Sequence, residues 1–240
     1  MGATTAFAQS KPTVAAELPP PAITIEIGYG VHLPAGTMAA RFGFDNYLNG
    51  GVHYVTPKLW VFGIDGGYFF GYDLKEDPLR KLRTPDGYLL GSDRENAFVT
   101  MDERGWLAGL MIGKIVPTTP KLPESGIRLT LTAGYMQHFI RIKDDNGTVP
   151  ALAEPYLKGY DRLTGGAYIT EFVGYQYIDR QGFMSLFAGF ESTQGFTKSL
   201  RSWNTDLMAA DTRNRLDILN GFRIGWTLPI RQKKSADIFY

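Results

Sequence analysis

The sequence predicts an all-β protein, an eight-stranded antiparallel up-and-down transmembrane β-barrel with long outer loops and short periplasmic turns. Three observations support this fold class. Apolar residues recur at every second position, short and long connections alternate along the chain, and the polar positions carry mostly small residues and isolated charges.

Strict alternation defines the first and last predicted strands. The apolar positions of the first strand are Ile23, Ile25, Ile27, Tyr29, Val31 and Leu33. The intervening positions hold Thr24, Glu26, Gly28, Gly30 and His32. The last strand repeats the pattern from Leu216 to Ile230, with Asn220 as the one polar residue on its apolar side. Successive side chains of a strand point to opposite faces, so this period of two predicts strands rather than helices.

We predict eight strands from this period. They cover residues 22–33, 44–56, 59–71, 105–117, 126–142, 165–178, 183–197 and 214–231. The sixth strand is the least regular, because Glu171 lies among the apolar Ile169, Val173 and Tyr175. Placing Thr170 on the polar face leaves Phe172 pointing inward, so the pattern leaves this register open.

The connections between the strands alternate in length. Residues 57–58, 118–125 and 179–182 form the short ones, and residues 34–43, 72–104, 143–164 and 198–213 form the long ones. Outer-membrane barrels have this asymmetry, with short periplasmic turns and long outer loops. An even number of strands then places both termini in the periplasm.

The composition of the polar face decides which face contacts lipid. The period alone fits a soluble lipocalin-like barrel equally well, with its apolar face inside. A face of Gly, Thr and Ser suits the narrow interior of an eight-stranded barrel better than it suits water. The apolar face has almost no Lys or Arg, each of which costs roughly 2–4 kcal/mol near the bilayer midplane. Aromatic residues near strand ends predict interfacial girdles, namely Tyr29, Trp60, Tyr68, Trp106, Tyr135, Tyr175 and Trp226.

Isolated charges on the polar face predict an interior network. It consists of Glu26, Asp65, Arg128, Glu191, Asp217 and Arg223, with His53 beside them. Buried charges are tolerated when they are paired and hydrogen-bonded. We therefore expect the network to plug the lumen, and a narrow ion path is the alternative.

The sequence predicts no catalytic, cofactor or metal site. The chain has 0 cysteines, which excludes disulfides and thiolate chemistry. Its histidines, His32, His53 and His138, lack a serine two residues away and lack clustered carboxylates, so we expect ordinary polar strand residues. A formal net charge of +1 gives no reason to expect nucleic acid. No apolar run reaches the roughly 18 residues of a transmembrane helix.

Residues 72–104 are long for a structureless loop. Residues 88–90 and 97–99 predict a small hairpin that extends the third and fourth strands. The mixed charges of this segment fit a solvated surface loop. A calcium, lipopolysaccharide or partner site is the alternative, although no spacing matches a calcium loop.

The two ends of the chain are interpreted separately from the barrel. Residues 1–21 are expected to be a signal-peptide remnant and flexible lead-in, because Ala6-Phe7-Ala8 fits a cleavage site with Gln9 as the first mature residue. Residues 22–232 form the barrel. Residues 233–240 form a periplasmic tail, whose terminal aromatic is either an insertion signal or part of a docking peptide.

Several stretches of the chain resemble small outer-membrane barrels of Bacteroidota. They are AFAQ at 6–9, GYDRLTGG at 159–166, GFESTQGFT at 189–197 and GWTLPI at 225–230. The resemblance spans nearly the whole mature chain and implies the barrel fold and an outer-membrane location. It implies no catalytic residue. Some barrels of that phylum are subunits of larger secretion or assembly machines.

We therefore expect a non-enzymatic, plugged outer-membrane barrel that is a structural or accessory subunit of an envelope assembly or secretion complex. Outer-membrane lipid and lipopolysaccharide would surround it, and envelope proteins would bind its outer loops and C-terminal tail. A small pore or carrier of hydrophobic molecules is the second hypothesis. A lipid-modifying barrel enzyme is the third.

Overall fold

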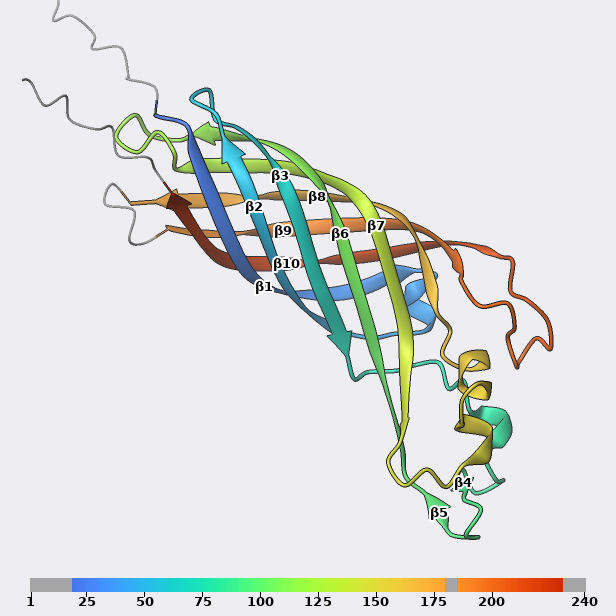
Figure 1. Ribbon diagram of the computed structural model, residues 1–240. Coiled ribbons are helices and arrows are strands. Elements are labelled where there is room, and N and C mark those ends of the chain that lie inside the picture. Colours follow the sequence, from blue (N-terminus) through green and yellow to red (C-terminus); the bar gives the residue numbers. More distant parts are fainter. Residues whose placement is uncertain (1–18, 180–184, 231–240) are drawn as a thin grey trace, which may run out of the picture.

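The computed structural model describes residues 19–179 and 185–230, and its long strands form a closed antiparallel barrel (Figure 1). The barrel strands are β1 (Ala22–Gly36), β2 (Asp45–Val55), β3 (Trp60–Gly71), β6 (Val99–Pro117), β7 (Gly126–Asp144), β8 (Thr164–Ile178), β9 (Ser185–Ser199) and β10 (Asn214–Ile230). Each strand pairs with its neighbours in chain order, and β10 closes the ring against β1. Closure gives every strand two partners, which satisfies the backbone polar groups that a bilayer cannot.

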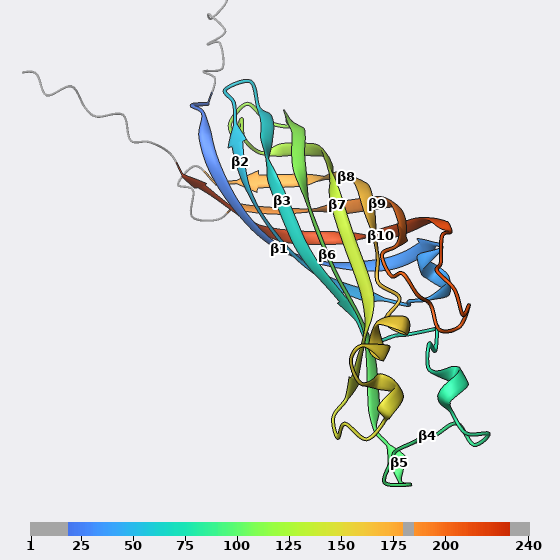
Figure 2. The same ribbon diagram turned by 45° about the vertical axis from the view of Figure 1, so that its right-hand side comes forward.

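The long and short connections lie at opposite ends of the barrel (Figures 1 and 2). We call these the loop end and the turn end. The start of β1 and the end of β10 lie at the turn end. The long connections carry short 3-10 helices, namely η1 (Met38–Ala40), η2 (Arg80–Leu82), η3 (Pro150–Leu152) and η4 (Tyr156–Gly159). This confirms the predicted alternation of connection lengths.

The outer face of the barrel is apolar along most of its surface. Ile23, Ile27, Ile64 and Leu110 are between 49% and 71% exposed, although each is a large aliphatic side chain. The aromatic residues expected near the strand ends also point outward and are each at least 40% exposed. A continuous apolar face on a closed sheet is the surface that contacts hydrocarbon, so the barrel is a transmembrane one. Within the described residues, no helix combines the length and apolar character needed to cross a membrane.

The eight predicted strands are confirmed, and one boundary differs clearly. The fourth begins at Val99 rather than at residue 105. Residues 99–102 pair only with β7, because β3 ends at Gly71, opposite Glu103. The run Asp102-Glu103-Arg104 hides the alternation here, since all three charged side chains are buried. Four of the expectations fall outside the described residues. They are the start of the seventh strand at residue 183, the end of the eighth strand at residue 231, the signal-peptide remnant up to residue 18 and the tail at 233–240.

The expected hairpin in the long connection exists, but it does not extend the barrel strands. β4 (Leu89–Leu90) and β5 (Asn96–Ala97) pair with each other in a separate two-stranded sheet. Leu89 is buried with Leu79, Val149 and Leu152, which belong to two different loops. The hairpin therefore packs within the loop layer, and β6 and β7 alone extend the barrel wall towards it (Figure 2).

The structure settles the register of β8, which the sequence leaves open. Phe172 points into the lumen and is 1% exposed. Glu171 consequently faces outward, between Leu131 of β7 and Ser192 of β9. An inward phenylalanine and an outward glutamate reverse the usual preference of a membrane barrel, and both have structural consequences described below.

Candidate functional site

The lumen holds a column of buried ionisable side chains. The six charges expected there are all 6% exposed or less, namely Glu26, Asp65, Arg128, Glu191, Asp217 and Arg223. Side chains at these depths must find hydrogen-bonding partners within the protein. Their contacts fall into two chains and one separate pair.

The first charge chain runs Arg128–Glu26–His53–Asp65. Arg128 Nη1 donates a hydrogen bond to Glu26 Oε1. His53 Nδ1 lies 3.4 Å from the same Glu26 oxygen, and His53 Nε2 lies 2.9 Å from Asp65 Oδ1. These side chains come from β7, β1, β2 and β3, so the chain crosses the lumen and ties four strands together.

The second charge chain has the same order of residue types, Arg223–Glu191–His32–Asp45. Arg223 Nε lies 3.4 Å from Glu191 Oε2, and His32 Nε2 lies 3.0 Å from Glu191 Oε1. His32 Nδ1 lies 2.9 Å from Asp45 Oδ1. This chain joins β10, β9, β1 and β2, so each glutamate contacts one arginine and one histidine, as in the first chain.

Two inward phenylalanines fill the space between the arginines. Phe172 and Phe187 meet edge to face with ring centroids 6.0 Å apart. The guanidinium carbon of Arg223 lies 4.7 Å from the Phe172 centroid, and that of Arg128 lies 5.4 Å from the Phe187 centroid. Cation–π contact stabilises the parts of each guanidinium group that make no hydrogen bond to a carboxylate. This explains why an aromatic residue occupies the polar face of β8.

The loop end of the lumen is closed by a separate pair and by apolar side chains. His138 Nε2 lies 2.9 Å from Asp217 Oδ2, and Thr37 from the first loop donates to the other Asp217 oxygen. Met38 and Phe42 of the same loop are fully buried. Phe42 meets the His138 ring edge to face at 5.8 Å. The loop between β1 and β2 thus enters the barrel mouth and seals it.

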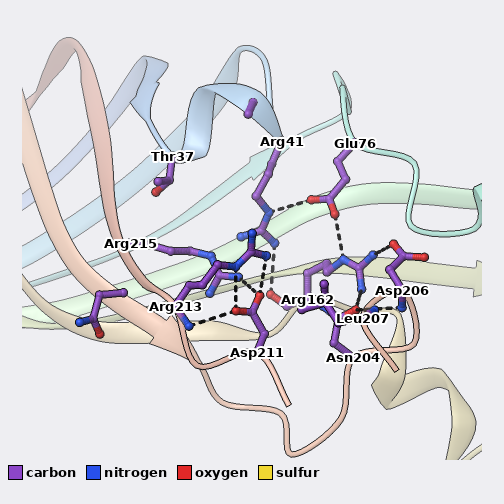
Figure 3. Close-up of a pocket in the computed structure, with 12 residues that line it drawn as sticks. Thr37, Arg41, Glu76, Arg162, Asn204, Asp206, Leu207, Asp211, Arg213 and Arg215 are labelled. Atoms are coloured by element: carbon purple, nitrogen blue, oxygen red, sulfur yellow. Dashed lines mark hydrogen bonds and ion pairs between the residues drawn. The ribbon is translucent and has the colours of Figure 1, made fainter. Parts of the chain in front are cut away.

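A pocket of about 340 Å³ lies above this seal, where all four long loops meet (Figure 3). Glu76 accepts hydrogen bonds from Arg41 Nε at 3.0 Å and from Arg162 Nε at 2.8 Å. Arg162 also donates to Asp206 and, at 3.0 Å, to Asn204. We call these five residues the loop lattice. Each of the four loops contributes at least one of them, so the lattice fixes the loops relative to one another.

The loop lattice lowers the pKa of one carboxylate, that of Glu76. Burial raises the pKa of Glu76, but Arg41 and Arg162 outweigh burial and hold this pKa below its ordinary value of 4.5. On the same pocket wall, the hydrogen bond from Arg213 is the main reason why the pKa of Asp211 is lowered. Both carboxylates are therefore ionised wherever the loops are folded at neutral pH. The pocket is lined by four arginines and three carboxylates, so charges of both signs face it.

Sequence reasoning missed several residues of the lumen. His32 and His138 are central to it, whereas the sequence suggested ordinary strand-end positions. Asp45 and the buried aromatic residues Tyr47, Phe69, Tyr168 and Phe187 were missed as well, and an inward Phe172 was only one of two open registers. The available signal was the alternation of faces. His32 lies an even number of residues after Glu26, and His138 an even number after Arg128, so each shares the face of a residue expected in the lumen. Both histidines lie far from the middle of their strands, so a polar strand-end position was the simpler interpretation. The loop between β1 and β2 that covers the barrel mouth cannot be inferred from a local sequence pattern.

The contacts of the histidines bear on chemistry. The side-chain hydrogen bonds of His32, His53 and His138 go to carboxylates rather than to hydroxyl groups. A hydrolytic site would instead pair a histidine with a nucleophile. Across residues 19–179 and 185–230, no group of three or more His, Asp or Glu side chains is arranged to hold a metal ion.

Comparisons with known proteins give structural matches only. No family model matches the chain, and no curated protein matches it. The crystal structure of Ail, the attachment invasion locus protein of Yersinia pestis, matches with 8% identity over 87% of this chain and 99% of that one, at a TM-score of 0.42. A structure of Ail in complex with the heparin analogue sucrose octasulfate matches at 0.39. Neisserial surface protein A matches with 10% identity over 85% of this chain and 96% of that one, at a TM-score of 0.42. The closed strand pairing and the apolar outer face of the chain itself define the transmembrane barrel.

Proposed function

We propose that this protein is a non-enzymatic outer-membrane barrel whose lumen is plugged, and that it is a structural or accessory subunit of an envelope assembly or secretion complex. The observation that carries the proposal is the filled lumen. Two charge chains, a phenylalanine pair and the inserted first loop occupy it from the turn end to the loop end. A barrel filled in this way offers neither a wide pore nor an empty ligand cavity.

The loop end supports a role in binding. The loop lattice holds residues from four loops in one arrangement, which lowers the entropy lost when a partner binds. Paired charges of both signs make this surface suited to a protein or a sugar-phosphate surface rather than to a small apolar ligand. We propose that the loops face the cell exterior and that both termini are periplasmic. Residues 233–240 would then be available to a periplasmic partner.

Conductance in planar bilayers tests the plug. We expect no stable openings from the purified barrel. The double variant Glu26→Ala/Arg128→Ala removes the first cross-lumen pair and should admit ions, which shows that the assay can detect an opened lumen. Stable single-channel openings of the wild-type barrel would instead favour the small-pore hypothesis.

Affinity purification from native membranes tests the subunit role. A tag in an exposed loop, for example after Gly147, should recover a stoichiometric envelope partner. Recovery of the barrel without such a partner, combined with altered lipid A or phospholipid in a deletion strain, would support the lipid-modifying hypothesis and reject the subunit role.

A further inference from the structure

The pocket at the loop end holds more positive than negative side chains. Four arginines and three carboxylates line it, and each carboxylate lies against two cations. The three groups are Arg41–Glu76–Arg162, Arg213–Asp211–Arg215 and Arg162–Asp206–Lys81. Five cations thus share three carboxylates, and the walls of the pocket keep a surplus of positive charge.

The floor of the pocket does not remove this surplus. Asp217 lies beneath Thr37, whose hydroxyl group donates to it, and Asp217 is only 1% exposed. Its other oxygen accepts a hydrogen bond from Thr197 and contacts His138. Asp217 attracts Arg41 from a distance, but it makes no ion pair with an arginine in the described part of the chain. Five cations still face four carboxylates when Asp217 is counted.

Two arginines of the pocket wall have unused hydrogen-bond donors. Arg215 Nη2 donates to Asp211, whereas Arg215 Nη1 is buried and has no hydrogen-bond partner among the described residues. Arg41 Nη1 reaches Thr164 at 3.4 Å, and Arg41 Nη2 reaches the Arg162 carbonyl at 3.2 Å. Each of these nitrogens carries two hydrogens, so one on each stays unused. A buried donor without an acceptor is costly, and an acceptor is therefore missing here.

The same two arginines oppose each other as like charges. Arg41 is 8% exposed, and the side chain of Arg215 is 12% exposed. Burial lowers the pKa of Arg41 and the charge of Arg215 lowers this pKa further, whereas Glu76 opposes both effects. The side chains of Arg41, Arg213 and Arg215 converge on the pocket (Figure 3). An anion between Arg41 and Arg215 would supply the missing acceptor and reduce their repulsion.

We propose that this pocket binds the phosphoryl group of a phosphorylated sugar between Arg41 and Arg215. The proposal rests on the binding role proposed above for the loop end and names the ligand class for it. Guanidinium forks bind the oxygens of phosphate in pairs. A phosphoryl group offers three acceptor oxygens, one more than a carboxylate. The third oxygen can be reached by Arg213, whose side chain is 70% exposed and free to turn inward.

The remaining space suits the sugar. The pocket volume of about 340 Å³ lies within the range of small-molecule sites, roughly 300–1,000 Å³. Asp206, with a side chain 36% exposed, and the exposed Asn214 also line the pocket. Their oxygen and amide groups can bind sugar hydroxyl groups. The phosphorylated sugar can be a soluble sugar phosphate or the sugar region of lipopolysaccharide, and both present the same chemistry to the pocket.

Titration calorimetry on the purified full-length barrel in a neutral detergent tests the site. Glucose 1-phosphate should bind, and glucose should not. Arg215→Gln should weaken the binding of glucose 1-phosphate by about tenfold, because it removes charge-assisted hydrogen bonds. Asp211 keeps two contacts of 3.0 Å with Arg213 in this variant, so the loop retains an ion pair. Arg80→Gln, an exposed arginine outside the pocket, should bind like wild type. Resistance of the unheated barrel to SDS verifies that each variant is folded.

Lipopolysaccharide and its dephosphorylated form separate the two sources. Binding that is lost on dephosphorylation and in Arg215→Gln identifies lipopolysaccharide, whereas binding of glucose 1-phosphate alone identifies a soluble sugar phosphate. The proposal is overturned if the folded wild type binds neither ligand, if the unphosphorylated forms bind equally well, or if Arg215→Gln binds like Arg80→Gln. Failure of the plug or of the subunit role would show instead in conductance or in partner recovery, and neither changes this titration.

Discussion

Glu191 and Glu171 lie within one register step of each other, on opposite faces of the same sheet. Glu191 is opposite Phe172, and Glu171 is opposite Ser192. Inside, Glu191 is 1% exposed and contacts Arg223 and His32. Outside, Glu171 points into the apolar belt with no partner among the described residues. The same residue type at the same depth is thus part of the fold in one case and unsatisfied by it in the other.

This difference separates the two kinds of polar residue that a membrane barrel holds. Those in the lumen stabilise the barrel, because removing one leaves its partner buried and unpaired. Those on the outer face, such as Glu171, contribute little to the stability of the barrel, because they pair with no buried charge among the described residues. Stability measurements on the monomer should therefore distinguish the two regions.

The largest effect is expected from the two glutamates compared directly. Glu191→Leu should lower the free energy of unfolding by about 3–5 kcal/mol, since it leaves Arg223 buried without its carboxylate. Glu171→Leu should change it by less than about 1 kcal/mol or raise it, because Leu suits lipid. Urea unfolding in detergent micelles measures both. Equal losses would remove the distinction between the two faces.

The second largest loss of unfolding free energy is expected when Arg128, the arginine of the first charge chain, is removed. Arg128→Met should cost about 3 kcal/mol, because it leaves the buried Glu26 carboxylate with His53 and Thr227 but without a permanent positive charge beside it. The double variant Glu26→Leu/Arg128→Met should regain much of the loss, since it leaves no unpaired charge. Arg80→Met, which removes an exposed arginine from the loop between β3 and β6, is the control for loss of a positive charge. A double variant as unstable as the single one would contradict the pairing.

A smaller effect is expected where glycine makes room for a lumen ring. A Cβ atom on Gly105 would overlap the ring of Phe69, its cross-strand neighbour. Gly105→Val should therefore lower the unfolding free energy by about 1–3 kcal/mol. Gly66→Val faces outward, where the nearest atom to an added Cβ is 3.5 Å away, and should be nearly neutral in the same unfolding assay. Similar losses for both would point to strand propensity rather than to lumen packing.

The smallest effect is expected in the loop lattice and depends on pH. The pKa of Glu76 is lower in the folded state than its ordinary 4.5, so its ionised form stabilises the folded loops above that pH. This contribution should be lost as the pH falls through the lowered folded-state pKa. Thermal unfolding of wild type and Glu76→Gln should differ by about 1 kcal/mol at pH 7 and converge at low pH. A difference that does not depend on pH would rule out this linkage.

The amino-acid sequence by itself determined the number of barrel strands and, where the alternation is regular, the face of each residue. A period of two is a local property, because each side chain points opposite to its neighbour whatever the strand pairs with. The alternation of Ile23 to Leu33 and of Leu216 to Ile230 therefore identified β1 and β10 directly. The same alternation predicted which charged residues lie on the polar face, but it did not indicate their partners. These residues are Glu26, Asp65, Arg128, Glu191, Asp217 and Arg223.

Only the tertiary structure decided which residues meet. Contacts across the lumen depend on strand register and on closure of the ring, which bring together residues such as Glu26 and Arg128 that are far apart in the chain. The inward position of Phe172 follows from the two guanidinium groups beside it, and those groups come from β7 and β10. The outward position of Glu171 follows in turn, because adjacent residues of a strand cannot share a face.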